Sequence, residues 1–179
     1  AGSSRWIVSP DGALDGLPLE ALGPGEGTQG DRLLAAVEIT YVPSFSAWRQ
    51  LARAPALRGG RAVVLGDPVY PGEAVASRGT RGLGRLAFSG DEARSAAAKF
   101  DPGSTTVLLR ETATLSALQE ALAPVRSPIR LLHLACHASS DFERPRLSSL
   151  ILAGGEAWSL DAILHAHVPA ELVVLSACE

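Results

Sequence analysis

Short apolar runs alternate with amphipathic stretches along the last two thirds of the chain. Four segments rich in apolar residues have the length and composition of buried strands, at residues 61–66, 105–110, 129–135 and 171–177. Helical patterns separate them, at residues 89–100, 115–123 and 159–165. A short accessory strand is predicted at 150–152. This alternation predicts an α/β fold with a mostly parallel, doubly wound sheet and right-handed crossovers.

The first part of the chain follows a different pattern. A short strand is predicted at 5–9, and residues 37–42 alternate with period two, which indicates an antiparallel partner for it. Ser44 is predicted to cap a helix over residues 45–53.

We divide the chain into an N-terminal strand and helix segment, residues 1–60, and an α/β core, residues 61–179, within one domain overall. The run at 171–177 is apolar on both faces, which is typical of a strand inside a sheet. Only Cys178 and Glu179 follow it. We therefore expect the sheet to be incomplete on its C-terminal side and to be completed by a further segment. The chain contains no Met, which fits a processed product or a piece of a longer protein.

Composition narrows the class of protein. Hydrophobic residues make up 46% of the chain and charged residues 20%, which fits a globular domain rather than a disordered one. The net charge of -3 gives no basic footprint for nucleic acid. There is no apolar stretch long enough to cross a bilayer and no secretory pattern at the start. Two cysteines are too few for a disulfide scaffold, so we expect a cytoplasmic protein without membrane contact.

Two reactive side chains follow predicted strands, His137 after one and Cys178 after the other. The carboxyl ends of parallel strands meet at one edge of a sheet, so neighbouring strands would bring this imidazole and thiol together. Imidazole raises the thiolate fraction of a cysteine and protonates a leaving amine. The backbone amides of Ala138 and Cys178 are candidates for binding the oxyanion. This pair predicts a cysteine peptidase, although spacing alone leaves a structural role equally open.

The other histidines and the second cysteine have simpler explanations. Neighbouring strand residues point to opposite faces, so Cys136 is predicted to be a core residue, and His133 a buried histidine or a helper near the site. A zinc site of His133, Cys136 and His137 is disfavoured, because Cys136 faces the wrong way and no second ligand cluster exists. We expect no metal and no cofactor. His165 and His167 are interpreted as surface residues.

An ordered set of short motifs resembles the CHAT domain, a bacterial caspase-like module that is often fused to tetratricopeptide repeats. The motifs lie at residues 7–14, 17–22, 41–44, 65–68, 133–137 and 175–179. The family is similar in fold to caspases, separase and legumain. The resemblance implies a caspase-like three-layer α/β/α sandwich. It also implies that His137 is the acid/base and Cys178 the nucleophile.

The resemblance implies a caspase-like cysteine endopeptidase that cleaves a protein substrate and is controlled by an attached or partner repeat domain. The alternative is a catalytically inactive interaction module with the same fold. Relatives often have glycine where this chain has Ala138, and the family domain continues beyond the cysteine. A ligand-binding domain of flavodoxin type is a third possibility, which the lack of a Gly-rich phosphate loop before a helix disfavours.

In the wider group, residues just after the first core strand line the pocket for the substrate side chain, and Asp67 has this place. A buried carboxylate there would favour Arg or Lys in the substrate. The simpler interpretation, which we favour, is that Asp67 caps the turn before Pro68. Asp141 is a second candidate for substrate contact, with a solvated loop as its simpler explanation.

Overall fold

The computed structural model describes residues 4–14, 16–23, 32–53, 60–72, 82–123 and 127–177. Contacts within the chain divide it into two compact units, Ala1–Pro55 and Ala56–Glu179. This boundary falls a few residues before the division that the sequence suggested.

The smaller unit is built on two strands, β1 (Ser4–Val8) and β2 (Val37–Tyr41), followed by the helix α2 (Phe45–Leu51). The strands pair in parallel, so the predicted antiparallel hairpin is wrong. The connection between them is long and includes the helix α1 (Leu33–Ala36), which gives the chain room to cross over and enter β2 in the same direction. The predicted cap of α2 is confirmed, because the Ser44 hydroxyl accepts a hydrogen bond from the Ala47 amide.

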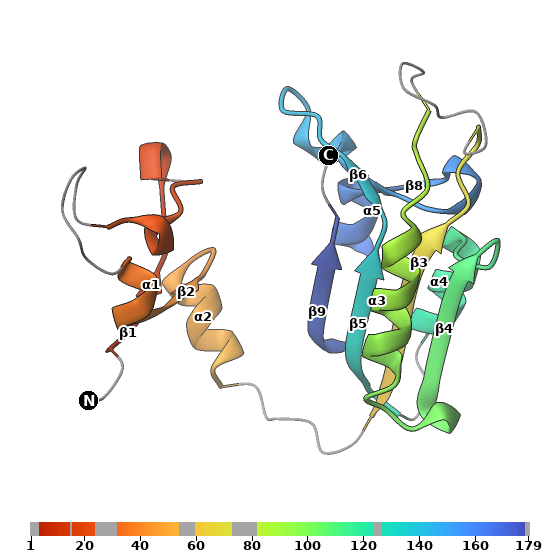
Figure 1. The fold of residues 1–179 in the computed structure, drawn as a ribbon, viewed down its shortest axis with the longest axis horizontal. Helices are drawn as coiled ribbons and strands as arrows, with labels where there is room; N and C mark the ends of the chain where they lie inside the picture. The colour runs from red at the N-terminus through yellow and green to blue at the C-terminus, as the bar shows by residue number, and fades with distance from the viewer. Residues whose placement is uncertain are drawn as a thin grey trace. The chain divides into compact units, whose positions relative to one another are not determined.

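The larger unit is built on a sheet of four parallel strands in the order β4-β3-β5-β9 (Figure 1). The strands are β3 (Arg61–Pro68), β4 (Thr105–Arg110), β5 (Ile129–Ala135) and β9 (Ala170–Ser176). The four predicted core strands and their parallel arrangement are thereby confirmed. Because β5 and β9 are neighbours, the segments that follow them leave the sheet at the same edge.

Helices cover both faces of this sheet. One face packs against α3 (Ala87–Ala97), and the other packs against α4 (Leu115–Leu122) and α5 (Leu160–His165) (Figure 1). This is the three-layer α/β/α arrangement that the resemblance implied. Gly66 lets α3 approach closely, since a Cβ at this position would lie 2.4 Å from the carbonyl oxygen of Ser89.

A second, smaller sheet follows directly after β5. It is antiparallel, with the order β6-β7-β8, and its strands are β6 (His137–Ser139), β7 (Ser149–Ile151) and β8 (Ala157–Ser159). Sequence analysis predicted only the middle strand, from the apolar residues 150–152. β6 and β8 are too short to display a period of two and lack such an apolar run. The chain therefore passes from the parallel sheet into this one at Cys136, and His137 is the first residue of β6.

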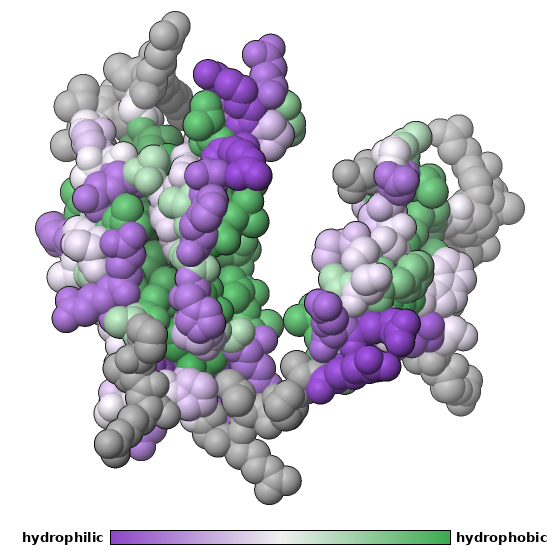
Figure 2. Space-filling model, turned by 180° about the vertical axis from the view of Figure 1, so that it is seen from behind, coloured by the Kyte–Doolittle hydropathy of each residue, from purple (hydrophilic) through white to green (hydrophobic). Residues whose placement is uncertain are grey.

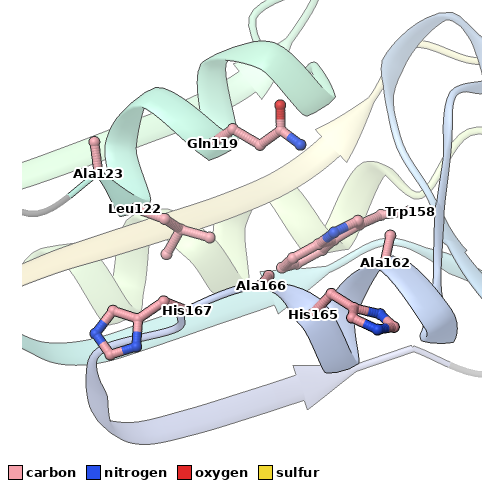
Figure 3. Close-up of a pocket in the computed structure, with 8 residues that line it drawn as sticks. All are labelled: Gln119, Leu122, Ala123, Trp158, Ala162, His165, Ala166 and His167. Atoms are coloured by element: carbon pink, nitrogen blue, oxygen red, sulfur yellow. The ribbon is translucent and has the colours of Figure 1, made fainter.

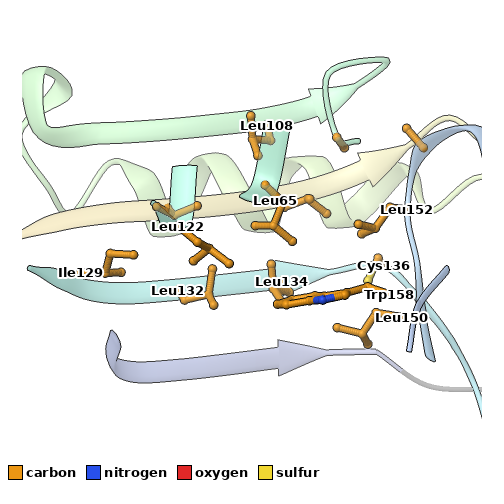
Figure 4. Close-up of a cluster of buried hydrophobic side chains, with 14 residues drawn as sticks. Leu65, Leu108, Leu122, Ile129, Leu132, Leu134, Cys136, Leu150, Leu152 and Trp158 are labelled. Carbon is orange, nitrogen blue, oxygen red and sulfur yellow. The ribbon is translucent and has the colours of Figure 1, made fainter. Parts of the chain in front are cut away.

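The main core lies on the α4 and α5 face of the sheet (Figure 4). Its central side chains, Leu134 and Cys136 of the β5 segment and Trp158 of β8, are each at most 3% exposed. Removing a side chain of this size from water stabilises a fold by about 2 kcal/mol. Burial of Trp158 thus fastens the small sheet onto the parallel one.

β9 lies at the edge of the sheet and has β5 as its only neighbour in the described part of the chain. Leu172, Val173 and Leu175 are between 45% and 59% exposed, and Figure 2 displays apolar surface along this edge of the larger unit. Natural proteins usually cover or blunt an apolar edge of this kind. The expectation that a further segment covers it stays a prediction.

No helix among the described residues is both long enough and apolar enough to span a bilayer.

Leu134→Ala should lower the free energy of unfolding by about 3 kcal/mol, because it leaves a cavity in the main core. Leu172→Ala is the matched control, since this leucine is 55% exposed and its truncation should cost less than about 1 kcal/mol. Urea denaturation of both variants measures the difference. Equal losses would contradict this description of the core.

Candidate functional site

His137 is held against a buried tyrosine at the carboxyl edge of the parallel sheet. Its backbone N–H donates to the Tyr70 hydroxyl at 3.0 Å, and that hydroxyl donates to the carbonyl of Ile151 at 3.3 Å. The two rings also pack together, with their centroids 4.9 Å apart. Tyr70 is 2% exposed, so it forms a fixed wall for the imidazole. Tyr70 was missed by sequence analysis, which gave no signal beyond its place shortly after β3.

The imidazole of His137 has a backbone partner on its outer nitrogen. Nε2 lies 2.8 Å from the carbonyl oxygen of Gly84. A carbonyl can only accept, so Nε2 carries the hydrogen, and in the neutral ring Nδ1 is the basic atom. In many catalytic triads a carboxylate fixes the tautomer in this way. Sequence analysis found no third member, because a backbone carbonyl has no residue signature.

A cavity of about 540 Å³ opens beside His137. It lies between the segment that enters α3 and the ends of β5 and β9, at the carboxyl edge where parallel sheets bind their ligands. Its walls include His137, Arg85, Leu86, Phe88, Ser89 and Ser176. Phe88 is 89% exposed and forms an apolar rim.

The two cysteines have very different surroundings. Cys136 is 1% exposed in the main core, as predicted, and burial raises the pKa of its thiol to about 11 (Figure 4). It is therefore almost wholly protonated at neutral pH and a poor nucleophile. Cys178, the predicted nucleophile, lies outside the described residues.

Asp67 is buried at the end of β3 between two arginines. Its carboxylate accepts hydrogen bonds from Arg85, with Nη2 at 2.7 Å and Nε at 3.1 Å, and from Nη1 of Arg110 at 3.0 Å. Its backbone has a φ of 46°, an uncommon conformation for a residue other than glycine, and its N–H donates to the Ser89 hydroxyl. These contacts on β3, β4 and the segment before α3 fix the carboxylate in place.

Burial by itself would raise the pKa of Asp67, but the hydrogen bonds and charges of Arg85 and Arg110 outweigh it and lower the pKa. Asp67 is therefore ionised in the folded protein. It does not line the cavity beside His137, whereas Arg85 does. A direct role for Asp67 in binding substrate stays a prediction.

Ala138, the candidate oxyanion residue, lies in β6 opposite Leu150 of β7. Among the described residues other than glycine, only Asp67 and Arg110 have a positive φ. Ala138 therefore adopts its backbone conformation without the strain that would require glycine. Its role in oxyanion binding stays a prediction.

Asp141, the second substrate candidate, organises the loop after β6. Its carboxylate accepts hydrogen bonds from the backbone N–H and the side chain of Arg144, and its own N–H donates to Ser148. These contacts explain Asp141 as a loop residue, and its contact with substrate stays a prediction.

His133 is buried on the α3 face, as expected, at 4% exposed. Its Nε2 lies 3.3 Å from Oε1 of Glu92, within ion-pair distance but without the alignment of a hydrogen bond. The other oxygen of Glu92 accepts from the Ser176 hydroxyl at 3.1 Å. Glu92 of α3 thus contacts side chains of both β5 and β9, an arrangement that sequence analysis missed.

His165 and His167 are exposed, which confirms their assignment to the surface. They line a shallow hollow beside Trp158, and Figure 3 shows their rings at separate ends of it. In the part of the chain that the structure describes, no group of three or more His, Cys, Asp or Glu side chains could hold a metal ion.

A comparison with models of known protein families shows to which family the chain belongs. The family model of the CHAT domain matches residues 2–179, almost the whole chain. The chain belongs to the CHAT domain family. No curated protein matches it. The CHAT domain is related to caspase-like proteases, so a peptidase-like chemistry is its coarse functional class.

Cys136 of this CHAT domain should resist alkylation by iodoacetamide at pH 8 in the folded protein, because a thiol with a pKa of about 11 is only about 0.1% ionised there. Mass spectrometry of tryptic peptides measures the extent of labelling. The urea-unfolded chain is the control, in which Cys136 should react fully. Rapid labelling of Cys136 in the folded chain would contradict its burial.

Asp67→Asn should lower the free energy of unfolding at pH 7 by roughly 2 kcal/mol, because it leaves two arginines without their buried partner. A carboxyl whose pKa is lowered on folding stabilises the fold above its unfolded pKa of about 4 and stops doing so as pH falls through the lower, folded value. The gap between the native chain and Asp67→Asn should therefore narrow as pH drops below about 4.

The surface pair of Asp91 with Arg94 provides the matched control for this measurement. Asp91→Asn should change the stability by about 0.5 kcal/mol or less at any pH, since both side chains are exposed. A gap between the native chain and Asp67→Asn that is as small as this, or that does not depend on pH, would contradict the described charge cluster.

Proposed function

We propose that this CHAT domain is a caspase-like cysteine endopeptidase that cleaves a protein substrate with Cys178 as nucleophile and His137 as acid/base. The observation that carries the proposal is the hydrogen bond between Nε2 of His137 and the Gly84 carbonyl, at the wall of a cavity. It orients the imidazole and leaves Nδ1 as the basic atom.

The register of the sheet supports the pairing of His137 with Cys178. Ala135 of β5 is matched with Ser176 of β9, and in a parallel pair matched residues project from the same face. His137 and Cys178 each come two positions after this matched pair in the sequence. The proposal is that the same relation continues beyond the strands and brings the thiol to the imidazole.

The surroundings of Cys136 support Cys178 by elimination. The sequence has two cysteines, and Cys136 is buried with its pKa raised to about 11. A thiol of this kind gives neither the exposure nor the thiolate that attack on a peptide requires.

In the proposed reaction, Nδ1 of His137 takes the proton from Sγ of Cys178, and the thiolate attacks the carbonyl carbon of the scissile peptide. The backbone amides of Ala138 and Cys178 would bind the resulting oxyanion. The intermediate collapses to a thioester as the C–N bond breaks, and the imidazolium returns its proton to the leaving amine. Water then hydrolyses the thioester with the imidazole as base, which restores the thiol.

Control of this activity would come from outside the catalytic pair. An attached or partner repeat domain is proposed to regulate access to the cavity, and the apolar edge of β9 is proposed to be covered by a further segment.

A catalytically inactive interaction module is the second candidate for the function of this domain. The observation that favours it is the same edge, since Leu172, Val173 and Leu175 form an exposed apolar surface suited to a binding partner.

Cys178→Ala should abolish cleavage of peptides, and His137→Ala should lower the rate by about a hundredfold or more. Cys136→Ala, the matched control, should leave the rate within a few fold of the native chain, because its sulfur takes no part in the chemistry. Cleavage of a mixed peptide library, followed by mass spectrometry, measures all three. If Cys178→Ala cleaves as well as the native chain, the assignment of the nucleophile is wrong.

A further inference from the structure

The polar groups in the wall of the cavity beside His137 are already engaged with other parts of the protein. The Ser89 hydroxyl donates to the carbonyl of Leu86 and accepts from the Asp67 amide. The Ser176 hydroxyl donates to Glu92. The Nε2 hydrogen of His137 is directed at Gly84. The protons of these three polar groups are therefore already donated within the protein and are not directed at a substrate side chain in the cavity.

Arg85 is the residue of this wall that also binds a buried carboxylate. It lines the cavity with its side chain half exposed, and it grips the buried Asp67 carboxylate through both Nε and Nη2. Asp67 is only 3% exposed and does not line the cavity. Arg85 thus occupies the one buried carboxylate of the described residues that could attract a basic side chain.

The charges around the cavity are also balanced. Asp67 is paired with both Arg85 and Arg110, and the carboxylate of Glu92 lies behind Ser176. A substrate arginine would meet the guanidinium of Arg85 in the cavity wall, and a substrate aspartate would compete with Asp67 for it. Leu86, Phe88 and Ala177, by contrast, offer apolar surface. Breaking the ion pair of a buried carboxylate costs free energy, whereas burying an alkyl group is favourable.

We infer that the cavity selects an uncharged, apolar substrate side chain, and that Arg85 sets this preference by neutralising Asp67. The inference rests on the proposed peptidase function, since it names the substrate class of that site. It also replaces the alternative considered from the sequence, in which a carboxylate at Asp67 would favour Arg or Lys in the substrate.

Binding of small probes tests the preference without requiring catalysis. The Cys178→Ala chain, labelled with ¹⁵N, is titrated with the N-acetyl amides of leucine, arginine and aspartate, and the amide signals of His137 and Ala177 are followed by NMR. The leucine probe should bind at least about tenfold more tightly than either charged probe. Equal or tighter binding of a charged probe, or no binding of any probe, would overturn the inference.

Substitution of Arg85 tests its role. Arg85→Met should weaken the preference for leucine over arginine by about tenfold, because it uncovers Asp67. Arg94→Met is the matched control, since it removes an arginine of the same helix region from an exposed pair with Asp91 and should leave the preference unchanged. A change in Arg85→Met no larger than that in Arg94→Met would overturn the role of Arg85.

The double variant Asp67→Asn with Arg85→Met removes both charges of the pair and guards against misfolding of the single variant. It should bind the leucine probe as the native site does. It should also lose the increased affinity for the arginine probe that Arg85→Met is expected to show. An increased affinity for the arginine probe that persists in the double variant would exclude Asp67 as its cause.

Labelling of Cys178 in the native chain by a leucine chloromethyl ketone is measured separately. Its failure would refute the proposed peptidase function and leave the binding result standing.

Discussion

The parallel pairing of β5 with β9 is the constraint on which the candidate site depends. It fixes where two distant parts of the sequence leave the sheet, and it sets the face on which the following residues project. Everything near His137 is arranged relative to this edge. Glu92 reaches across from α3 to both strands, and the cavity lies between their ends and the start of that helix. The position of the candidate site is therefore set by backbone hydrogen bonds between β5 and β9 rather than by any single side chain.

Sequence patterns were sufficient for the parallel core because its strands are long and apolar. β4 and β5 have the predicted bounds, and the other two core strands differ from prediction by a residue or two at their ends. The pattern failed where the decisive information is not local. The direction of β2 relative to β1 depends on the path of a long connection, and β6 and β8 are too short to display a period.

Only the side chains that follow predicted strands could be assigned to the candidate site from the sequence. His137 stood out because an imidazole follows a buried strand, and Cys136 was correctly assigned to the core from the alternation of faces. Gly84 and Tyr70 were missed because one acts through its carbonyl and the other through a contact between distant segments. The partners of Asp67 could not be predicted either, since Arg85 and Arg110 come from different elements that meet only in the folded chain.

Gly84 and Arg85 are consecutive residues with separate tasks. The carbonyl of the first orients the imidazole, and the guanidinium of the second covers a buried carboxylate. A single peptide unit therefore joins the carbonyl that orients the proposed acid/base to the side chain that we infer sets the preference of the cavity. The arginine side chain can move about its own bonds, but a displacement of the backbone at this peptide unit would disturb both contacts.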